Sequence, residues 1–154
     1  MSKFLKRSAQ GAGVPHEKRT AGLETVAMPL PSKIVLSMNQ HIGAPAAPVV
    51  AKGDQVYVGT VVGKAGGFVS SDIHSGVSGT VAEISTMVGS NGSTQTTVVI
   101  TPDGEQKVDP SIAPPQVTDF KSFTDAIRAS GLVGLGGAVF PTAGKLSPKI
   151  LDEI

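Results

Sequence analysis

The sequence contains no cysteine and no tryptophan, and aromatic residues occupy only 4% of its 154 positions. Without cysteine, these residues form no disulfide and hold no iron–sulfur cluster or other thiolate-bound metal. A reducing, cytoplasmic setting fits this composition. Because large aromatic side chains are scarce, we expect a core built mainly from valine, isoleucine, leucine and alanine.

Long apolar runs and an excess of charge are missing as well. No apolar stretch approaches the ~20 residues that a membrane-spanning helix needs. Residues 1–7 carry positive charges but lack the apolar segment of a secretory signal. The formal net charge of +1 provides no basic field for nucleic acid. We therefore expect no transmembrane segment and no nucleic-acid partner, so any membrane association would depend on partner proteins.

Glycine and proline, by contrast, are abundant, at 19 and 11 residues. This composition favours short strands and many turns over long helices. The positions of the prolines and of the apolar runs predict four segments. These are an extended arm (1–32), a β module (33–108), a proline-rich linker (109–118) and the start of a second domain (119–154).

The β module is predicted from short apolar runs separated by turn signals. Residues 96–100 form the clearest strand, and shorter valine-rich runs precede it. The dipeptide Asn91-Gly92 predicts a tight turn because both residues tolerate a positive φ, and Lys52-Gly53-Asp54 and Asp103-Gly104 are further turn signals. Such regularly spaced strands indicate a small barrel or sandwich.

The second segment begins with the one helix that the periodicity predicts, at residues 119–130. Phe120, Phe123 and Ile127 fall on one face, either Thr118 or Asp119 could cap the start, and Gly131 could end the helix. A glycine-rich stretch follows, and the sequence given ends at residue 154. A domain that opens with one helix and a glycine loop cannot bury a core of its own. We therefore expect a truncated second domain.

Parts of the β module resemble biotinyl and lipoyl carrier domains. Residues 50–62 resemble the first half of those domains and residues 73–81 the second half, with Gly53 and Gly79 at related turns. The resemblance implies a mainly β barrel-sandwich hybrid. Carriers present a lysine at the hairpin tip between the halves, whereas residues 66–71 contain none and Lys64 lies too early. We therefore expect a docking module and no attached lipoyl or biotin group.

The histidines do not predict a metal centre. His16, His41 and His74 show no spacing typical of a metal site, so no metal site is assigned. His41 is expected to pack at the edge of the module, and His74 to be structural or exposed.

The glycine loop, defined here as residues 131–141, is the most informative segment for function. Glycines allow a ligand to approach the backbone closely, and successive N–H groups can bind phosphate or flavin oxygens. Pro141 suits the first turn of a following helix, and Lys145 could add a positive charge. The segment is neither a G-x-G-x-x-G fingerprint nor a P-loop. Composition alone leaves open a nucleotide-type ligand or a tight structural turn.

The run of residues 130–142, with Lys145, resembles the flavin loop of the NADH-oxidising subunit of respiratory complex I and its relatives. The resemblance implies the start of an α/β FMN/NADH-binding domain after the β module. It implies FMN contacts from Gly134, Gly136 and Lys145, and NADH contacts from Gly137, Ala138 and Phe140. It assigns no catalytic residue. Val139 stands where complex I has glycine, and a β-branched residue there restricts the backbone beside the nucleotide.

A further resemblance narrows the family to the C subunit of Rnf-type electron-transport complexes. It rests on residues 13–18 and 67–70 and above all on residues 40–45, Gln40-His41-Ile42-Gly43-Ala44-Pro45. It implies part of an ion-translocating NADH:ferredoxin-type oxidoreductase that passes electrons between NAD(H), FMN and 4Fe-4S clusters. The clusters would lie beyond residue 154, and other subunits would hold the protein at the cytoplasmic face of the inner membrane.

Two other functions stay open at this point. One is a non-catalytic docking module, in which the glycines are structural. The other is a flavoprotein of the cobalamin-reductase type found in bacterial microcompartments, which shares the same architecture. On any of these hypotheses, the 154-residue chain alone is expected to be inactive.

Overall fold

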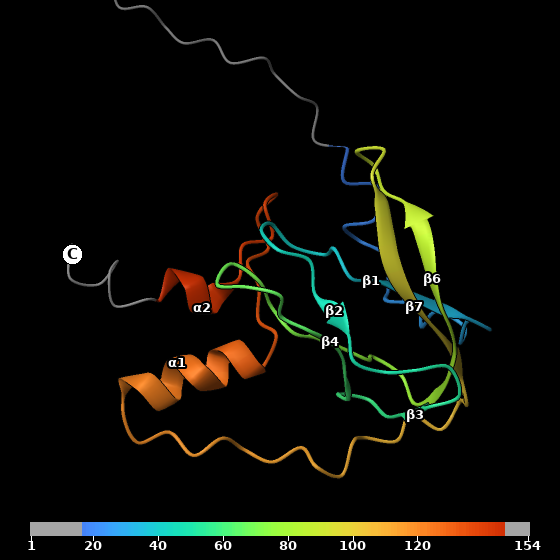
Figure 1. The fold of residues 1–154 in the computed structure, drawn as a ribbon. Coiled ribbons are helices and arrows are strands. Elements are labelled where there is room, and N and C mark those ends of the chain that lie inside the picture. Colours follow the sequence, from blue (N-terminus) through green and yellow to red (C-terminus); the bar gives the residue numbers. More distant parts are fainter. Residues whose placement is uncertain (1–16, 147–154) are drawn as a thin grey trace, which may run out of the picture.

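A computed structural model describes residues 17–146, which contain a curled set of strands with two helices beside it (Figure 1). Residues 17–32 contain no helix or strand. The first 16 residues of the predicted arm and residues 147–154 lie outside the described part. The elements are β1 (Ile34–Ser37), β2 (Ala47–Pro48), β3 (Gln55–Val56), β4 (Val61–Lys64), β5 (Ile73–His74), β6 (Gly79–Val88), β7 (Thr94–Pro102), α1 (Phe120–Ala129) and α2 (Thr142–Lys145).

The larger sheet is antiparallel and has the order β1-β7-β6-β3. Its central strand β7 contains the strand predicted at residues 96–100, with Val98 and Ile100 completely buried. Strands β6 and β7 are joined by the predicted tight turn, where Gly92 has a φ of 77°. A register shift between Val81 and Glu83 interrupts the β6–β7 ladder. Such a bulge increases the local twist and bends the sheet toward a half-barrel.

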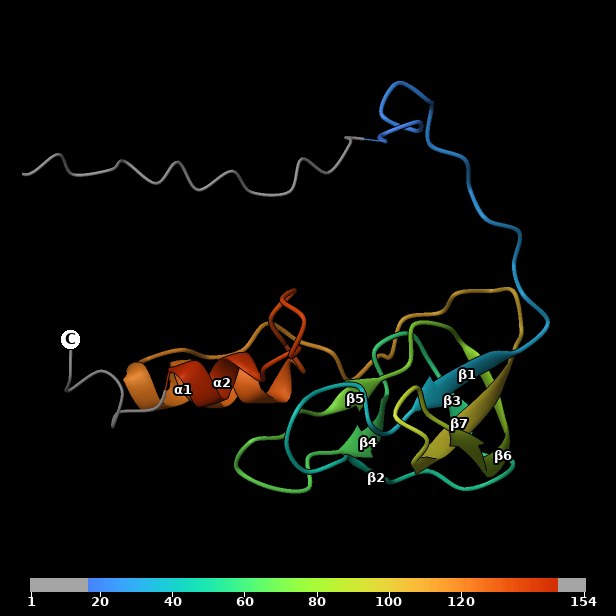
Figure 2. The ribbon, with the colours of Figure 1, turned by 90° about the horizontal axis from the view of Figure 1, so that it is seen from above.

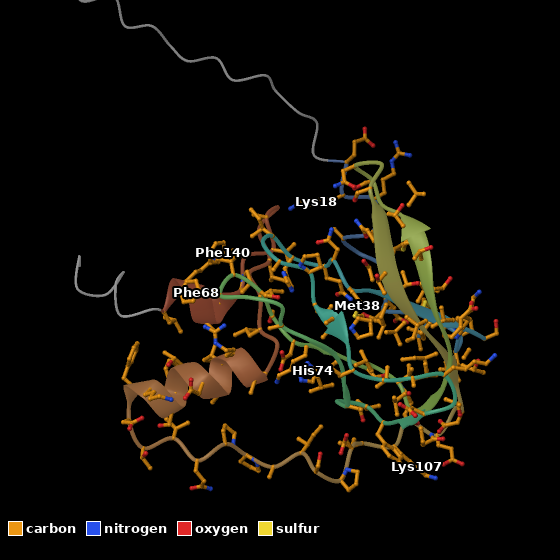
Figure 3. The ribbon with its side chains drawn as sticks, in the orientation of Figure 1. Lys18, Met38, Phe68, His74, Lys107 and Phe140 are labelled. Carbon is orange, nitrogen blue, oxygen red and sulfur yellow. The ribbon has the colours of Figure 1, made fainter. Side chains whose placement is uncertain are left out.

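The smaller sheet has the order β2-β4-β5 and faces the larger one across a shared core. The edge position of β2 explains how it accommodates Pro48, because proline cannot donate a ladder hydrogen bond. Met38 lies between the two sheets (Figure 3). As the composition predicted, aliphatic residues make up the core: Met38, Ala46, Val56, Val62, Ile73, Val77, Val81, Val98 and Ile100.

The two carrier-like turns lie beside each other. Gly53 N–H donates to the Val81 carbonyl at 2.8 Å, and Val81 N–H donates to the Asp54 carbonyl at 2.9 Å. Gly53 has a φ of 94° and Gly79 one of 157°. A Cβ on Gly79 would overlap the Thr101 carbonyl oxygen. Both glycines are thus required by the backbone, in agreement with the barrel-sandwich hybrid.

Helix α1 begins and ends where the sequence predicts. Asp119 is its N-cap and forms a reciprocal capping box with Ser122, which satisfies N–H groups that would otherwise lack partners. Gly131 follows the helix with a φ of 72°, a conformation that suits glycine. Viewed from above, α1 and α2 lie together on one side of the strands (Figure 2). These two helices and the loop between them are all that the structure describes of the predicted α/β domain, whose fold and limits stay predictions.

Candidate functional site

The glycine loop leaves α1, turns back on itself and enters α2. Two hydrogen bonds join its ends: Thr142 N–H donates to the Leu132 carbonyl at 3.0 Å, and Gly134 N–H donates to the Phe140 carbonyl at 2.9 Å. At the tip, Val139 N–H donates to the Gly136 carbonyl at 2.9 Å and closes a tight turn. The loop is therefore a closed hairpin whose tip projects from a fixed base.

Three of the six predicted site residues converge at the base of this hairpin. Lys145 Nζ lies 3.0 Å from the position that a Cβ on Gly134 would take. The same nitrogen lies 5.9 Å from the centroid of the Phe140 ring, within the range of a cation–π contact. The ring also packs on α2, since a Cβ on Gly144 would meet Phe140 Cε1 at 3.0 Å. An ammonium group, an aromatic face and a bare backbone thus occupy one place.

The other three predicted residues, Gly136, Gly137 and Ala138, lie on the exposed tip. A Cβ on Gly136 or Gly137 would have no heavy atom within 4 Å, and neither residue has a left-handed φ. Within residues 17–146, therefore, neither packing nor backbone conformation requires glycine at these positions. What a side chain there would occupy is the open space in front of the loop, which fits a cradle for a ligand that approaches the backbone.

The charge of the site is simple. Residues 131–146 contain one ionisable side chain, Lys145, and no carboxylate. A single positive charge beside exposed backbone attracts an anion. The described part of α2 has only four residues, so we assign it no helix dipole, and the attraction depends on Lys145. The shifted pKa values lie elsewhere. One example is Asp109, whose pKa is lowered by hydrogen bonds from the hydroxyls of Ser111 and Thr60.

The hairpin tip that carries the lysine in carriers has another partner here. The Arg128 guanidinium lies 5.8 Å from the centroid of the Phe68 ring, and its Nη1 donates to the Phe68 carbonyl at 3.4 Å. Lys64 is held by the buried carboxylate of Asp72, with 2.6 Å between Nζ and Oδ2. The tip therefore contacts α1, and the nearest lysine is engaged away from the tip.

The structure describes two of the three histidines, and His16 lies outside its range. His41 is 7% exposed and packs between two loops, and His74 is half-buried in β5, where it faces Gly131 (Figure 3). In residues 17–146, no group of three histidine, cysteine, aspartate or glutamate side chains is placed to hold a metal ion. No helix in that range is long and apolar enough to cross a membrane.

Two contacts between the β module and the glycine loop were not predicted. Ile42 N–H donates to the Ala138 carbonyl at 3.2 Å. A Cβ on Gly131 would lie 2.7 Å from the Asp72 carbonyl oxygen and 2.9 Å from His74 Nδ1. Gly131 was predicted only as the end of a helix, although glycine is equally the residue that permits such a close approach. The sequence contains no local signal for the contact made by Ile42.

Together these features define a class of protein: a carrier-like barrel-sandwich hybrid without an attachment lysine, joined to a glycine loop with a nearby lysine. The comparison with known families identifies one family. The RnfC barrel sandwich hybrid domain matches residues 6–105. The chain belongs to this family and corresponds to the N-terminal part of the C subunit of Rnf-type ion-translocating oxidoreductase complexes.

Individual relatives, all of them C subunits of such complexes, agree with this assignment. The chain is 41% identical over 120 residues to that of the Na(+)-translocating ferredoxin:NAD(+) oxidoreductase complex of Acetobacterium woodii, covering 76% of this chain and 27% of that protein. It is 38% identical over 136 residues to that of the ion-translocating oxidoreductase complex of Rhodobacter capsulatus, covering 86% and 26%. It is 36% identical over 149 residues to that of the proton-translocating ferredoxin:NAD(+) oxidoreductase complex of Clostridium ljungdahlii, covering 94% and 33%. The chain thus spans about a quarter to a third of the length of these relatives.

Proposed function

We propose that the glycine loop is one wall of an FMN and NADH site in an oxidoreductase subunit of an ion-translocating electron-transport complex. One observation carries the proposal. The Lys145 ammonium and the Phe140 ring meet beside Gly134, next to the unobstructed backbone of Gly136 and Gly137. A positive charge, a flat apolar face and accessible N–H groups are what a phosphate-bearing aromatic cofactor needs.

Each residue has a separate task in this proposal. Gly134 and Gly136 let FMN approach the backbone, and Lys145 neutralises part of the phosphate charge. On the opposite side, Gly137, Ala138 and Phe140 face the nicotinamide nucleotide, where the Phe140 ring offers a flat surface and excludes water. FMN, when bound, supplies the exchange between two-electron hydride chemistry and one-electron transfer.

The remaining parts of the electron path belong to the whole subunit. We propose that 4Fe-4S clusters beyond residue 154 exchange electrons with the flavin. We also propose that other subunits hold the protein at the cytoplasmic face of the membrane. The relatives named above support this view, since two of them are named as ferredoxin:NAD(+) oxidoreductase subunits. The same names favour an Rnf-type subunit over a microcompartment flavoprotein. Because residues 17–146 provide only one wall of a site, the isolated chain is expected to retain no stoichiometric FMN.

The experiment compares two lysine substitutions in the full-length subunit. Lys145→Gln should weaken FMN binding about tenfold or more, because a hydrogen bond to a charged group contributes about 1.5–3 kcal/mol. Lys52→Gln changes a lysine in an exposed turn of the β module and serves as the matched control, with unchanged affinity. FMN titration of flavin-depleted protein measures both. Equal affinities in the two variants would remove Lys145 from the flavin site.

A non-catalytic docking module is the second candidate function. It is favoured by the hairpin tip of residues 66–71, which has no lysine and is packed by Arg128. The two candidates differ in the same experiment. A full-length subunit that binds no FMN before any substitution would leave docking as the function of this region.

A further inference from the structure

The β module holds the glycine loop at its nucleotide side. The contact is the hydrogen bond from Ile42 N–H to the Ala138 carbonyl, 3.2 Å long. Ala138 is one of the residues proposed to face NADH, and its carbonyl precedes Val139 directly. Whatever fixes Ile42 therefore also fixes the part of the loop that the nucleotide would contact.

Ile42 is fixed by the imidazole of His41. The ring is 7% exposed and spans two backbone segments: Nδ1 lies 3.1 Å from the Ile42 carbonyl oxygen, and Nε2 lies 3.1 Å from Ser71 N. Both hydrogen bonds form together when Nδ1–H donates to Ile42 and Nε2 accepts from Ser71 N–H. The imidazole thus joins the loop that bears Ile42 to the hairpin that bears Ser71.

These two segments are interlocked beyond His41. Ala44 N–H donates to the Val69 carbonyl at 3.0 Å, and the buried hydroxyl of Ser70 donates to the Ala44 carbonyl at 2.8 Å. Gly43, with a φ of 95°, leaves no room for a Cβ against Val69. The anchoring side of the contact is therefore rigid, and the Ile42 N–H has a defined position.

The held side of the contact is strained. Val139 has a φ of 46°, in the left-handed region. A β-branched residue rarely adopts this conformation, which persists only where the surroundings impose it. Val139 and His41 both line a cavity of about 280 Å³ between the β module and the loop, next to His74. The hydrogen bond from Ile42 reaches the peptide group that joins Ala138 to Val139.

We infer that the β module positions the nucleotide side of the glycine loop, and that His41 is the positioning residue through which it does so. The inference rests on the proposed function in one respect only, namely that a nucleotide binds at this side of the loop. The mechanical part of the inference, that His41 restrains residues 132–142, stands independently of any ligand.

The test uses the full-length subunit and has two readouts. The first is hydrogen exchange of the amides in residues 132–142, measured by mass spectrometry without ligand. His41→Ala should accelerate this exchange about fivefold, the effect of losing one hydrogen bond. His41→Gln can still accept from Ser71 N–H and should restore most of the protection. His41→Leu keeps the side-chain volume without either hydrogen bond and gives the same comparison where the alanine variant fails to fold.

Ser78→Ala is the matched control. Ser78 is also a completely buried polar residue of the β module, and its hydroxyl accepts from Lys107 N–H at 3.0 Å. Lys107 and Phe140 lie at opposite ends of the molecule (Figure 3). This substitution should leave exchange in residues 132–142 within about twofold of the wild type.

The second readout is the kinetics of NADH oxidation with an artificial electron acceptor. His41→Ala should raise KM for NADH about fivefold, with kcat and FMN content within about twofold of the wild type. In a Val139→Gly background the effect on KM should shrink below about twofold, because glycine adopts the left-handed φ without help. Exchange in residues 132–142 that is unchanged by His41→Ala overturns the inference, whatever the activity. A wild-type subunit that neither binds FMN nor oxidises NADH refutes the proposed function instead, and the exchange result then decides the mechanical claim alone.

Discussion

Alanine at Gly136 and alanine at Gly131 are expected to have opposite effects, although both residues belong to the same loop. At Gly136 a Cβ meets no heavy atom within 4 Å, whereas at Gly131 it would lie 2.7 Å from the Asp72 carbonyl oxygen. Gly131 also has a φ of 72°. One glycine is therefore required by the fold and the other is not.

The magnitudes follow from these differences. Gly136→Ala should leave stability unchanged or raise it by about 0.4–1 kcal/mol, because alanine restricts the unfolded chain. Gly131→Ala should lower stability by about 2 kcal/mol or more, since a left-handed alanine costs about 1–2 kcal/mol and the overlap adds to that. If Gly136 is glycine for the sake of FMN, its methyl group would occupy the cofactor's place. An overpacking cost of about 1–3 kcal/mol would then weaken FMN binding about tenfold.

The assay is a pair of measurements on the full-length subunit: thermal unfolding of the flavin-free protein, and FMN titration by fluorescence quenching. Gly76→Ala is the matched control, since Gly76 is exposed, has no atom near its Cβ position and lacks a left-handed φ. It should change neither quantity. The reasoning is refuted if Gly136→Ala binds FMN as tightly as the wild type, because the open space at Gly136 would then serve no ligand.

Two further predictions concern the β module. Ser78→Ala should destabilise it by about 1–3 kcal/mol in urea unfolding, because the buried Lys107 N–H partner is lost. The Ser78 hydroxyl also lowers the pKa of Asp103 below its ordinary value of 3.8, so this carboxylate stabilises the fold above that pH and loses its effect as the pH falls through the lowered value. Below about pH 4, unfolding of the Ser78→Ala variant should depend less on pH than that of the wild type, and equal slopes would contradict this account. Asp72→Asn should cost less than about 1 kcal/mol, because the partner lysine is mostly exposed and the amide oxygen can still accept from Ala65 N–H; a loss of several kcal/mol would show that the buried charge matters more.

The sequence predicted those parts of the fold that depend on local signals. The β6–β7 hairpin follows from the Asn91-Gly92 turn and the valine-rich strand after it, and α1 follows from its apolar period and the Asp119 cap. The short strands β2 and β5 carry no periodic signal in two residues each, and β2 contains a proline. They form only because the opposite strand β4 provides hydrogen-bond partners.

For the candidate site, the sequence predicted the residue types better than their arrangement. The convergence of Gly134, Phe140 and Lys145 was expected from the glycine loop alone, and the geometry agrees with it. The left-handed φ of Val139 could be anticipated in part, since this valine replaces a glycine of the complex I pattern. The contact between Ile42 and Ala138 joins residues nearly one hundred positions apart, and only the folded chain reveals it.

The central claim is that the glycine loop belongs to a flavin site that NADH reduces. The most direct test is an anaerobic visible spectrum of the full natural gene product, recorded before and after addition of NADH. The account predicts flavin absorbance that bleaches with NADH over an iron–sulfur background. A colourless protein, or a flavin spectrum that NADH leaves unchanged, would contradict it.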